Sequence, residues 1–237
     1  MLSAYRRMIR LSILTTSIAF CPARDVRIIR TVANRTFKPE TDQFFPSDDD
    51  DKRVRLPYFK YGFRTEPFEW EELVKIIAVD EDLAKLSRSV EQQKDYEIYR
   101  RELLKEWKTV VDHVLVSKFP STFEKRHDPE VDRYVAHPPI EEAVATVEEP
   151  QQVLVPNDFP YYTQTGIEHW VLWKLGGECS DEDIQKAIEE LKERFGDDII
   201  CWVNPPGLKS LPEIDHVHFL GKLQDNVVSI ENDQTCS

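Results

Sequence analysis

The chain has 237 residues, of which 41% are hydrophobic and 32% are charged, and its net charge is -13. This length suits one domain with extensions or two small domains, and the apolar fraction is sufficient for a hydrophobic core. Residues 1–38 hold eight Lys or Arg and one acidic residue, a net charge of +7, so the remainder carries -20. A body this acidic repels nucleic-acid phosphates and anionic membrane surfaces, so we expect no nucleic-acid partner.

Residues 1–38 have the composition of a targeting leader. The segment is rich in Arg and nearly free of acidic residues, which is typical of an organelle transit peptide. A second interpretation is bipartite: Arg6, Arg7 and Arg10 precede the apolar run LSILTTSIA, and SIAFCPA resembles the signal/transit junction of algal secondary plastids. The apolar run is too short for a membrane span. We therefore predict a plastid or mitochondrial protein, with an unprocessed arm on a cytoplasmic protein as the alternative.

The next segments are a linker, a domain and a tail. Residues 39–64 form an acidic linker, because PSDDDDKR combines a proline with a charge run. A single domain is predicted over residues 65–224, followed by a flexible tail over 225–237. Apolar residues recur at helical spacing over 66–119, which predicts helices that include a long N-terminal helix pair. Residues 120–156 are rich in Pro and Glu without a sustained period, so we expect a long acidic loop there.

The last third of the domain alternates between strands and a helix. The stretches GIEHWVLWKL, DIICWVN and HVHFLGKL have the apolar patterns of strands. Between the first two, Ser180 is expected to cap the amphipathic helix DEDIQKAIEELKERF, which ends at Gly196. We therefore predict an α+β fold in which residues 165–223 form a mainly antiparallel sheet of three or four strands, and helices from 66–119 and 180–196 cover it.

The sequence lacks the common signatures of cofactor and metal sites. The four cysteines form no CxxC pair, and no Cys/His spacing matches a zinc signature. A P-loop and the GxGxxG, GxSxG and HExxH motifs are also absent. The sequence therefore identifies no cofactor, and we expect no disulfide framework.

Three histidines are the candidate catalytic residues. His216 and His218 project from the same face of one predicted strand, because strand side chains alternate between faces. His169 lies on the inward face of another predicted strand. If the two strands are neighbours, the three imidazoles converge, and imidazoles carry protons near neutral pH or bind metals.

The loop before these histidines supplies a candidate ligand-binding set. Asn204 offers an amide, Lys209 an ammonium group and Ser210 a hydroxyl, and two prolines in NPPGLKS stiffen the loop. Groups of these types suit an anion such as a phosphate or a carboxylate. We therefore predict an anion site built from Asn204, Lys209 and Ser210 together with the histidines, with no metal.

Three other interpretations of the histidines stay open. They can be structural, each hydrogen-bonded inside the core. They can be ligands of a zinc hydrolase, although no Asp or Glu has the spacing of a general base. A histidine-triad nucleotide hydrolase would need a third histidine where Leu220 stands, and its glycine-rich companions are missing.

Four pieces of the chain together resemble one family. They are LSRSVEQQKDYEIYRRELLKEW, VPNDFPYYTQTGIEHWVLWKL, DEDIQKAIEELKERFGDDIICWVNPPGLKSLPEI and DHVHFL. In this order they resemble the N-acetylglucosamine-induced protein family, also described as a domain of unknown function, over roughly residues 66–223. The resemblance implies a link to N-acetylglucosamine metabolism, best known from fungi, and no assigned molecular activity. The organelle-like leader departs from a plain cytosolic member of that family.

Two classes of function remain. The first is an enzyme or binding protein for a small anionic metabolite, such as a sugar phosphate or a nucleotide sugar. The second is a non-catalytic regulatory or scaffold protein that acts through contacts with a protein partner, which the sequence does not identify. A metabolite site requires the histidines, Asn204 and Lys209 to face a common pocket, whereas a scaffold leaves them scattered or buried and has an exposed apolar patch elsewhere.

Overall fold

The computed structural model describes residues 28–30, 43–45, 54–56, 61–147 and 149–224. The predicted flexible tail and most of the predicted leader lie outside these residues, so their roles stay predictions. Among the helices that are described, none is long and apolar enough to cross a membrane.

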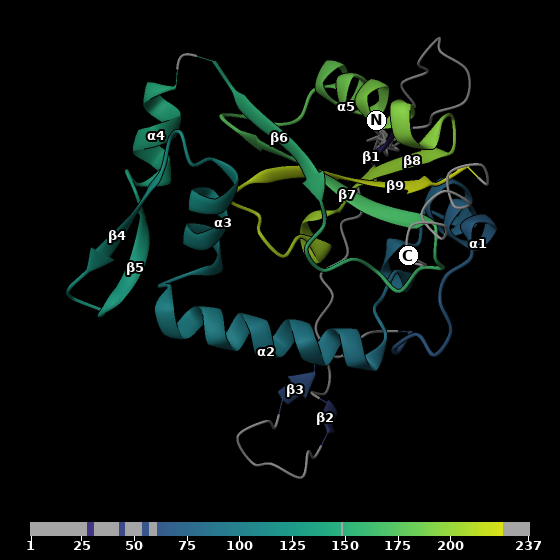
Figure 1. Ribbon diagram of the computed structural model, residues 1–237, viewed down its shortest axis with the longest axis horizontal. Coiled ribbons are helices and arrows are strands. Elements are labelled where there is room, and N and C mark those ends of the chain that lie inside the picture. Colours follow the sequence, from purple (N-terminus) through teal and green to yellow (C-terminus); the bar gives the residue numbers. More distant parts are fainter. Residues whose placement is uncertain (1–27, 31–42, 46–53, 57–60, 148, 225–237) are drawn as a thin grey trace, which may run out of the picture.

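A five-stranded sheet with the strand order β1-β8-β9-β7-β6 forms the centre of the molecule (Figure 1). Its strands are β1 (Ile28–Arg30), β6 (Gln151–Pro156), β7 (Ile167–Leu175), β8 (Ile199–Val203) and β9 (Asp215–Lys222). The pairs β6–β7, β7–β9 and β8–β9 are antiparallel, and β1 adds to β8 in parallel. The predicted α+β fold with a mainly antiparallel sheet is confirmed, and β6 is a further antiparallel strand that lies before the predicted range.

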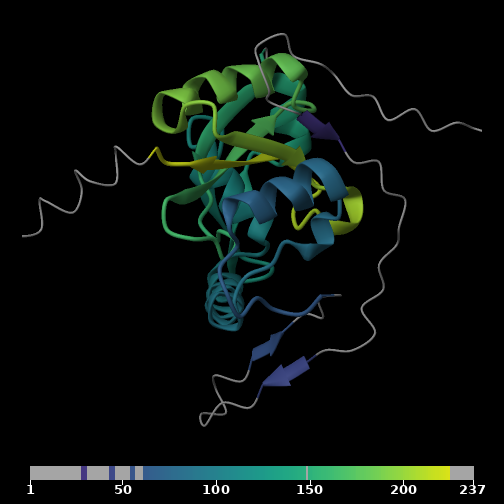
Figure 2. The same cartoon turned by 90° about the vertical axis from the view of Figure 1, so that its right-hand side faces the viewer.

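Helix α5 (Asp181–Phe195) covers one face of this sheet, as Figures 1 and 2 show. The Ser180 hydroxyl accepts a hydrogen bond from the Asp183 backbone N–H, and the Asp183 carboxylate accepts one from the Ser180 backbone N–H, so the predicted cap is a capping box. The helix ends at Gly196, as predicted, where φ is +61°. Its apolar side is buried, and its members are Ile184, Ala187, Ile188, Leu191 and Phe195.

Helices precede the four antiparallel strands of the sheet in the chain, but the longest periodic segment is broken in two. The elements are α1 (Trp70–Val74), the π-helical turn η2 (Lys75–Asp80), the 3₁₀ turn η3 (Leu83–Lys85), α2 (Val90–Glu106) and α3 (Val110–Lys118). Trp107 leaves the helical conformation, with φ -103° and ψ 145°. The Thr109 hydroxyl then accepts a hydrogen bond from the Asp112 backbone N–H and starts α3. The break separates α2 from α3 because a local capping signal overrides the continuous apolar period.

Residues 120–156 are not the long acidic loop that the sequence predicts. They contain a hairpin of β4 (Glu124–Asp128) and β5 (Arg133–His137), the helix α4 (Ile140–Thr146) and the strand β6. Phe123, Ala136 and Ala143 are buried in one apolar cluster with residues of α3. A few buried apolar residues are enough to order this segment. Exposed charged residues outnumber them, so the composition of the segment resembles that of a loop.

Short strands also occur where the sequence predicts only a linker and a leader. The strands β2 (Gln43–Phe45) and β3 (Val54–Leu56) pair with each other inside the predicted linker. Strand β1 lies inside the predicted leader. The stretches QFF and VRL flank the acidic run and contain aromatic and β-branched residues, which favour strands. The charge of the acidic run dominates the composition of the segment, so the sequence predicts a linker there.

The sheet face opposite α5 carries two apolar clusters with polar positions between them. One cluster joins Ile167 and Leu220 to the segment of α1, η2 and η3. The other joins Leu175 and Ile214 to α3 and α4. Along β7 and β9, the positions between these clusters include His169, His216 and His218. The fold therefore places all three predicted histidines on one buried surface.

Candidate functional site

Strand register brings the three histidines together. His218 pairs with Val171 of β7 on one side and with Trp202 of β8 on the other. His169 is a diagonal neighbour of His218, and its Nε2 lies 3.0 Å from His218 Nδ1. The ring centroids of His216 and His218 are 5.2 Å apart. The side-chain alternation of two adjacent strands thus produces a row of three imidazoles.

The hydrogen bonds in this row have a fixed direction. The Trp202 indole N–H donates to Asn204 Oδ1 over 3.0 Å, which identifies the other amide atom, Nδ2, as a donor. Asn204 Nδ2 therefore donates to His218 Nε2, also over 3.0 Å. A neutral His218 then carries its proton on Nδ1 and donates it to His169 Nε2. An indole N–H, which can only donate, thereby sets the tautomer of His218.

Asn204 organises this row through both ends of its side-chain amide. Its amide oxygen accepts from Trp202 and its amide nitrogen donates to His218, and its side chain also interacts with Tyr161. The Tyr161 ring stacks on His169, with the ring centroids 4.9 Å apart. In this arrangement Asn204 positions the ring of His218, and its predicted ligand-binding role stays a prediction.

All three imidazoles are buried and neutral at neutral pH. The exposed fractions of His169, His216 and His218 are 4%, 2% and 9%. Burial lowers the pKa of His169 to about 3, and the charge of Arg88 adds to this effect. Burial also lowers the pKa of His218 well below its usual value, with further lowering by His169, His216 and Arg88. Imidazoles with such low pKa values are weak bases, so the row suits recognition through hydrogen bonds better than proton transfer.

Lys209 and Ser210, the other predicted ligand-binding residues, do not join the row. Lys209 Nζ donates to Asp215 Oδ1 over 2.7 Å, and the other carboxylate oxygen of Asp215 accepts from the Cys179 backbone N–H. Burial alone would raise the pKa of Asp215, but these hydrogen bonds outweigh it and lower the pKa. Ser210 is exposed, and its side chain makes no hydrogen bond to any described residue. The ammonium group of this loop therefore pairs with the carboxylate of Asp215 and does not point into the histidine row.

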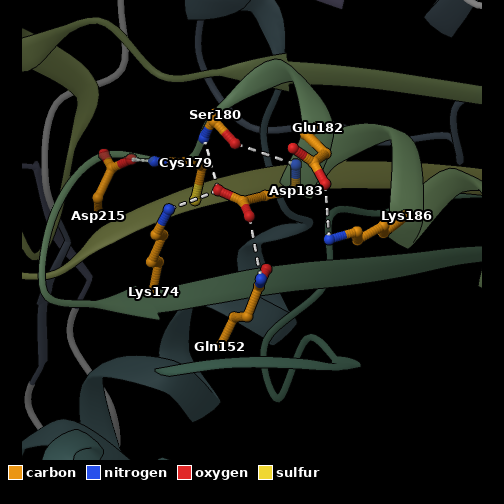
Figure 3. A network of polar contacts seen from close by, with 8 residues as sticks. All are labelled: Gln152, Lys174, Cys179, Ser180, Glu182, Asp183, Lys186 and Asp215. Carbon is orange, nitrogen blue, oxygen red and sulfur yellow. Dashed lines mark hydrogen bonds and ion pairs between the residues drawn. The ribbon is translucent and has the colours of Figure 1, made fainter. Parts of the chain in front are cut away.

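Asp215 lies beside a second polar network, at the start of α5 (Figure 3). Lys174 and Asp183 form a buried ion pair in which each residue is less than one tenth exposed. Gln152 and the Ser180 backbone N–H also donate to the Asp183 carboxylate. Burial favours a raised pKa for Asp183, but these donors lower it overall. Gln152 of β6 and Lys174 of β7 thus hold the first turn of α5, so the network anchors α5 to the sheet.

Arg88 is the residue at this site that sequence reasoning missed. Its Nε and Nη2 donate to the Phe159 carbonyl over 3.1 and 2.7 Å, and its Nη1 donates to Gln93 Oε1 over 3.1 Å. Glu97 acts on Arg88 only at a distance, since Gln93 stands between them and donates to the Glu97 carboxylate. No carboxylate of the described residues forms an ion pair with Arg88. Burial lowers the pKa of this guanidinium, and nearby Tyr161, Tyr96 and Glu97 partly offset that effect.

The described residues contain no group of three His, Cys, Asp or Glu side chains that could hold a metal ion. The zinc interpretation of the histidines therefore has no support in the geometry. The histidine-triad interpretation also lacks support, because Leu220 is fully buried in an apolar cluster. Burial raises the pKa of the Cys179 thiol and of the Cys201 thiol to about 12, which leaves neither as a nucleophile at neutral pH.

A model of the family described as "Protein of unknown function (DUF3605)" matches residues 69–222. The chain belongs to this family. The match contains α2, α5, the four antiparallel strands and every residue of the histidine row. No curated protein sequence matches the chain. Among solved structures, the crystal structure of HTC1 is similar at a TM-score of 0.43 and 18% identity, over 70% of this chain and 91% of that chain, and so distant a likeness carries no argument about function.

Within this family domain, the site combines two kinds of polar group. Arg88 supplies a positive charge whose influence reaches His169 and His218. The neutral imidazoles supply hydrogen-bond donors and acceptors of defined direction. The only sequence signal for Arg88 is its place directly before the Ser89 capping box of α2, and this position alone does not indicate a ligand.

Proposed function

We propose that the protein binds a small anionic metabolite at the histidine row. The observation that carries this proposal is Arg88, a partly buried cation with no carboxylate partner among the described residues. Removing a charge from water is costly unless an opposite charge and hydrogen bonds compensate. An anionic ligand beside Arg88 would supply that compensation. The chain has a net charge of -13 and therefore carboxylates in excess, yet none of those described forms an ion pair with Arg88.

A sugar phosphate or a nucleotide sugar is the class of ligand that fits best. The resemblance to N-acetylglucosamine-induced proteins favours a sugar derivative. The neutral imidazoles favour a ligand with hydroxyl groups, because a neutral imidazole both donates and accepts hydrogen bonds. The acidic body disfavours large polyanions, since it repels them over a long range. The low pKa values of the histidines favour binding over acid–base catalysis.

The ligand reaches the row by displacing the segment Asn157–Tyr161, which lies over His169. Asn157 donates its backbone N–H to the His169 carbonyl over 2.7 Å, and Tyr161 stacks on the imidazole ring. Arg88 holds the middle of this segment through the Phe159 carbonyl. An anion that binds Arg88 would compete with that carbonyl, so ligand binding and opening of the segment would be coupled.

Thermal unfolding in the presence of candidate anions tests the proposal. We expect glucose 6-phosphate or UDP-N-acetylglucosamine to raise Tm; a ligand at a hundred times its Kd adds about 2.7 kcal/mol, or about 5–10 °C for a protein of this size. Arg88→Met should remove the shift and Arg88→Lys should reduce it, while Arg126→Met on the exposed face of β4 should leave it intact.

Circular dichroism identifies any variant that fails to fold. If no anion raises Tm of the wild-type protein, the binding proposal is wrong and the scaffold alternative is favoured. If a shift occurs and survives Arg88→Met, the anion binds elsewhere.

A further inference from the structure

We propose that His216 selects ligands that offer an uncharged hydrogen-bond donor, such as a hydroxyl group, in addition to their anionic group. This inference rests on the anion-binding function proposed above and adds the chemistry of the second part of the ligand. It predicts that a hydroxylated phosphate binds much better than an apolar phosphate of the same shape.

The tautomer of His216 is fixed by its own backbone. Its Nδ1 lies 2.9 Å from the carbonyl oxygen of Ile214. Because a carbonyl can only accept, Nδ1 carries the proton. Burial lowers the pKa of His216, although the bond to Ile214 opposes this, and Lys209 lowers it further. The neutral ring therefore presents Nε2 as a lone-pair acceptor.

This acceptor has no donor among the described residues. The rings nearest to His216 are those of Trp173 and His218, with centroids at 4.8 and 5.2 Å. The two ring nitrogens of His218 are already committed to His169 and Asn204. Only 2% of His216 is exposed, so bulk water does not satisfy Nε2. A buried acceptor without a donor costs about 1–3 kcal/mol, and native proteins contain few of them.

The position of His216 relates this acceptor to the anion site. His218 stands between His169 and His216, with ring centroids 5.2 Å from each. The charge of Arg88 acts on His169 and His218. The charge of Lys209 acts on His218 and His216, and at His216 the Asp215 carboxylate opposes it. Arg88 thus acts on the His169 end of the row, and the open nitrogen of His216 lies at the other end, so a ligand that reaches both would carry its anionic group and its donor at opposite ends.

The chemistry of the complementary group follows from these surroundings. A carbonyl or ether oxygen would oppose one acceptor with another. An ammonium group is disfavoured by Arg88, which has no carboxylate partner among the described residues and whose charge reaches His218. A hydroxyl or an amide N–H remains, and a sugar phosphate carries hydroxyls on the side of its ring away from the phosphate.

A matched pair of ligands tests the inference by isothermal titration calorimetry. Glucose 6-phosphate and cyclohexylmethyl phosphate share a six-membered ring, a CH₂ group and a phosphate, and they differ in the ring oxygen and the hydroxyls. Inorganic phosphate reports on the anion site alone. We expect glucose 6-phosphate to bind at least tenfold more tightly than cyclohexylmethyl phosphate, as one satisfied buried acceptor would predict.

Two variants remove Nε2 in different ways. His216→Phe keeps an aromatic ring but leaves the Ile214 carbonyl unpaired. His216→Asn places an amide donor where Nδ1 was, so it keeps the bond to Ile214 and lacks only the distal acceptor. Both should abolish the preference for glucose 6-phosphate while changing the affinity for cyclohexylmethyl phosphate less than threefold. His127→Phe, on the exposed strand β4, should preserve the preference.

Each outcome decides between the two proposals. Equal wild-type affinities for the two ligands would overturn the role of His216 and leave anion binding intact. A preference that persists in the folded His216→Asn protein would also overturn it, because the hydroxyls would then be recognised elsewhere. Absence of binding by all three phosphates, together with no Tm shift from UDP-N-acetylglucosamine, would overturn both proposals.

Discussion

The two faces of the central sheet are built on different principles. On the α5 face, apolar residues of the helix and the strands form one continuous cluster, and the polar groups lie at its margin around the start of α5 (Figure 3). On the opposite face, two apolar clusters are separated by the row of His169, His218 and His216. Burial of apolar surface tolerates small displacements, whereas a row of directed hydrogen bonds does not. The face that sacrifices apolar packing for directed polar groups is the one expected to carry function.

The largest expected effect comes from breaking the buried ion pair between Lys174 and Asp183 at the start of α5. Lys174→Met leaves the buried carboxylate of Asp183 without its cation, and breaking a buried ion pair in this way costs about 3–5 kcal/mol. Urea denaturation followed by circular dichroism measures the change. The double variant Lys174→Met/Asp183→Asn removes both charges and should recover part of this loss. A single variant as stable as the wild type would mean that the ion pair does not anchor α5.

The next largest effect is a dependence of protein stability on pH, which arises from the buried histidines of the opposite sheet face. The pKa of His169 is about 3 in the folded protein, against 6.5 for an ordinary histidine. Below pH 6.5 the unfolded chain takes up a proton that the folded protein refuses until about pH 3, so stability falls as the pH drops through this window. The loss approaches about 1.4 kcal/mol per pH unit, or about 2 kcal/mol at pH 5 for this residue alone.

Urea midpoints at several pH values between 7.5 and 5 measure this slope. His169→Gln should reduce the slope by the contribution of one imidazole, while His216 and His218, whose pKa values burial also lowers, keep theirs. Ser180→Ala, which removes the cap of α5 at a cost of about 1 kcal/mol, should lower stability equally at every pH and keep the slope. An unchanged slope in His169→Gln would show that the acid sensitivity arises elsewhere.

A smaller effect separates positioning from burial within the row. Asn204→Ala deprives the Trp202 indole of its acceptor and His218 of its donor, and each unsatisfied buried group costs about 1–3 kcal/mol. Because part of this cost is relieved by entering water, we expect a total of about 1–3 kcal/mol. Loss of anion binding in a variant that remains folded would identify Asn204 as the residue that fixes the histidine tautomers. Retained binding would limit Asn204 to a structural role.

The sequence predicts the α5 face better than the opposite face because its signals are local. The capping box at Ser180, the apolar period of α5 and the strand patterns of β7, β8 and β9 each lie within a few consecutive residues. The alternation that places His216 and His218 on one face is equally local. Convergence of these two with His169 depended on whether two strands, far apart in sequence, are neighbours, and the sequence left that open.

Other features have no local signal. Arg88 meets Phe159, 71 positions away, and the pairing of Lys209 with Asp215 depends on how the loop turns rather than on its composition. In residues 120–156, a few buried apolar residues set the structure while exposed charges dominate the composition. Contacts between residues far apart in the sequence, and segments ordered by only a few buried residues, therefore could not be predicted from local sequence patterns.

The smallest expected effect concerns Ser210, which the sequence places in the ligand site and the structure places on the surface. Its side chain is exposed and has no hydrogen bond to a described residue, so Ser210→Ala should change stability by less than about 0.5 kcal/mol. It should also leave the Tm shift caused by glucose 6-phosphate unchanged, because the anion would be held by Arg88 on the far side of the row. A variant of normal stability that loses the ligand-induced shift would mean that the loop of Ser210 folds over the bound ligand. In that case the histidine face would owe its specificity to a loop closure as well as to the buried row.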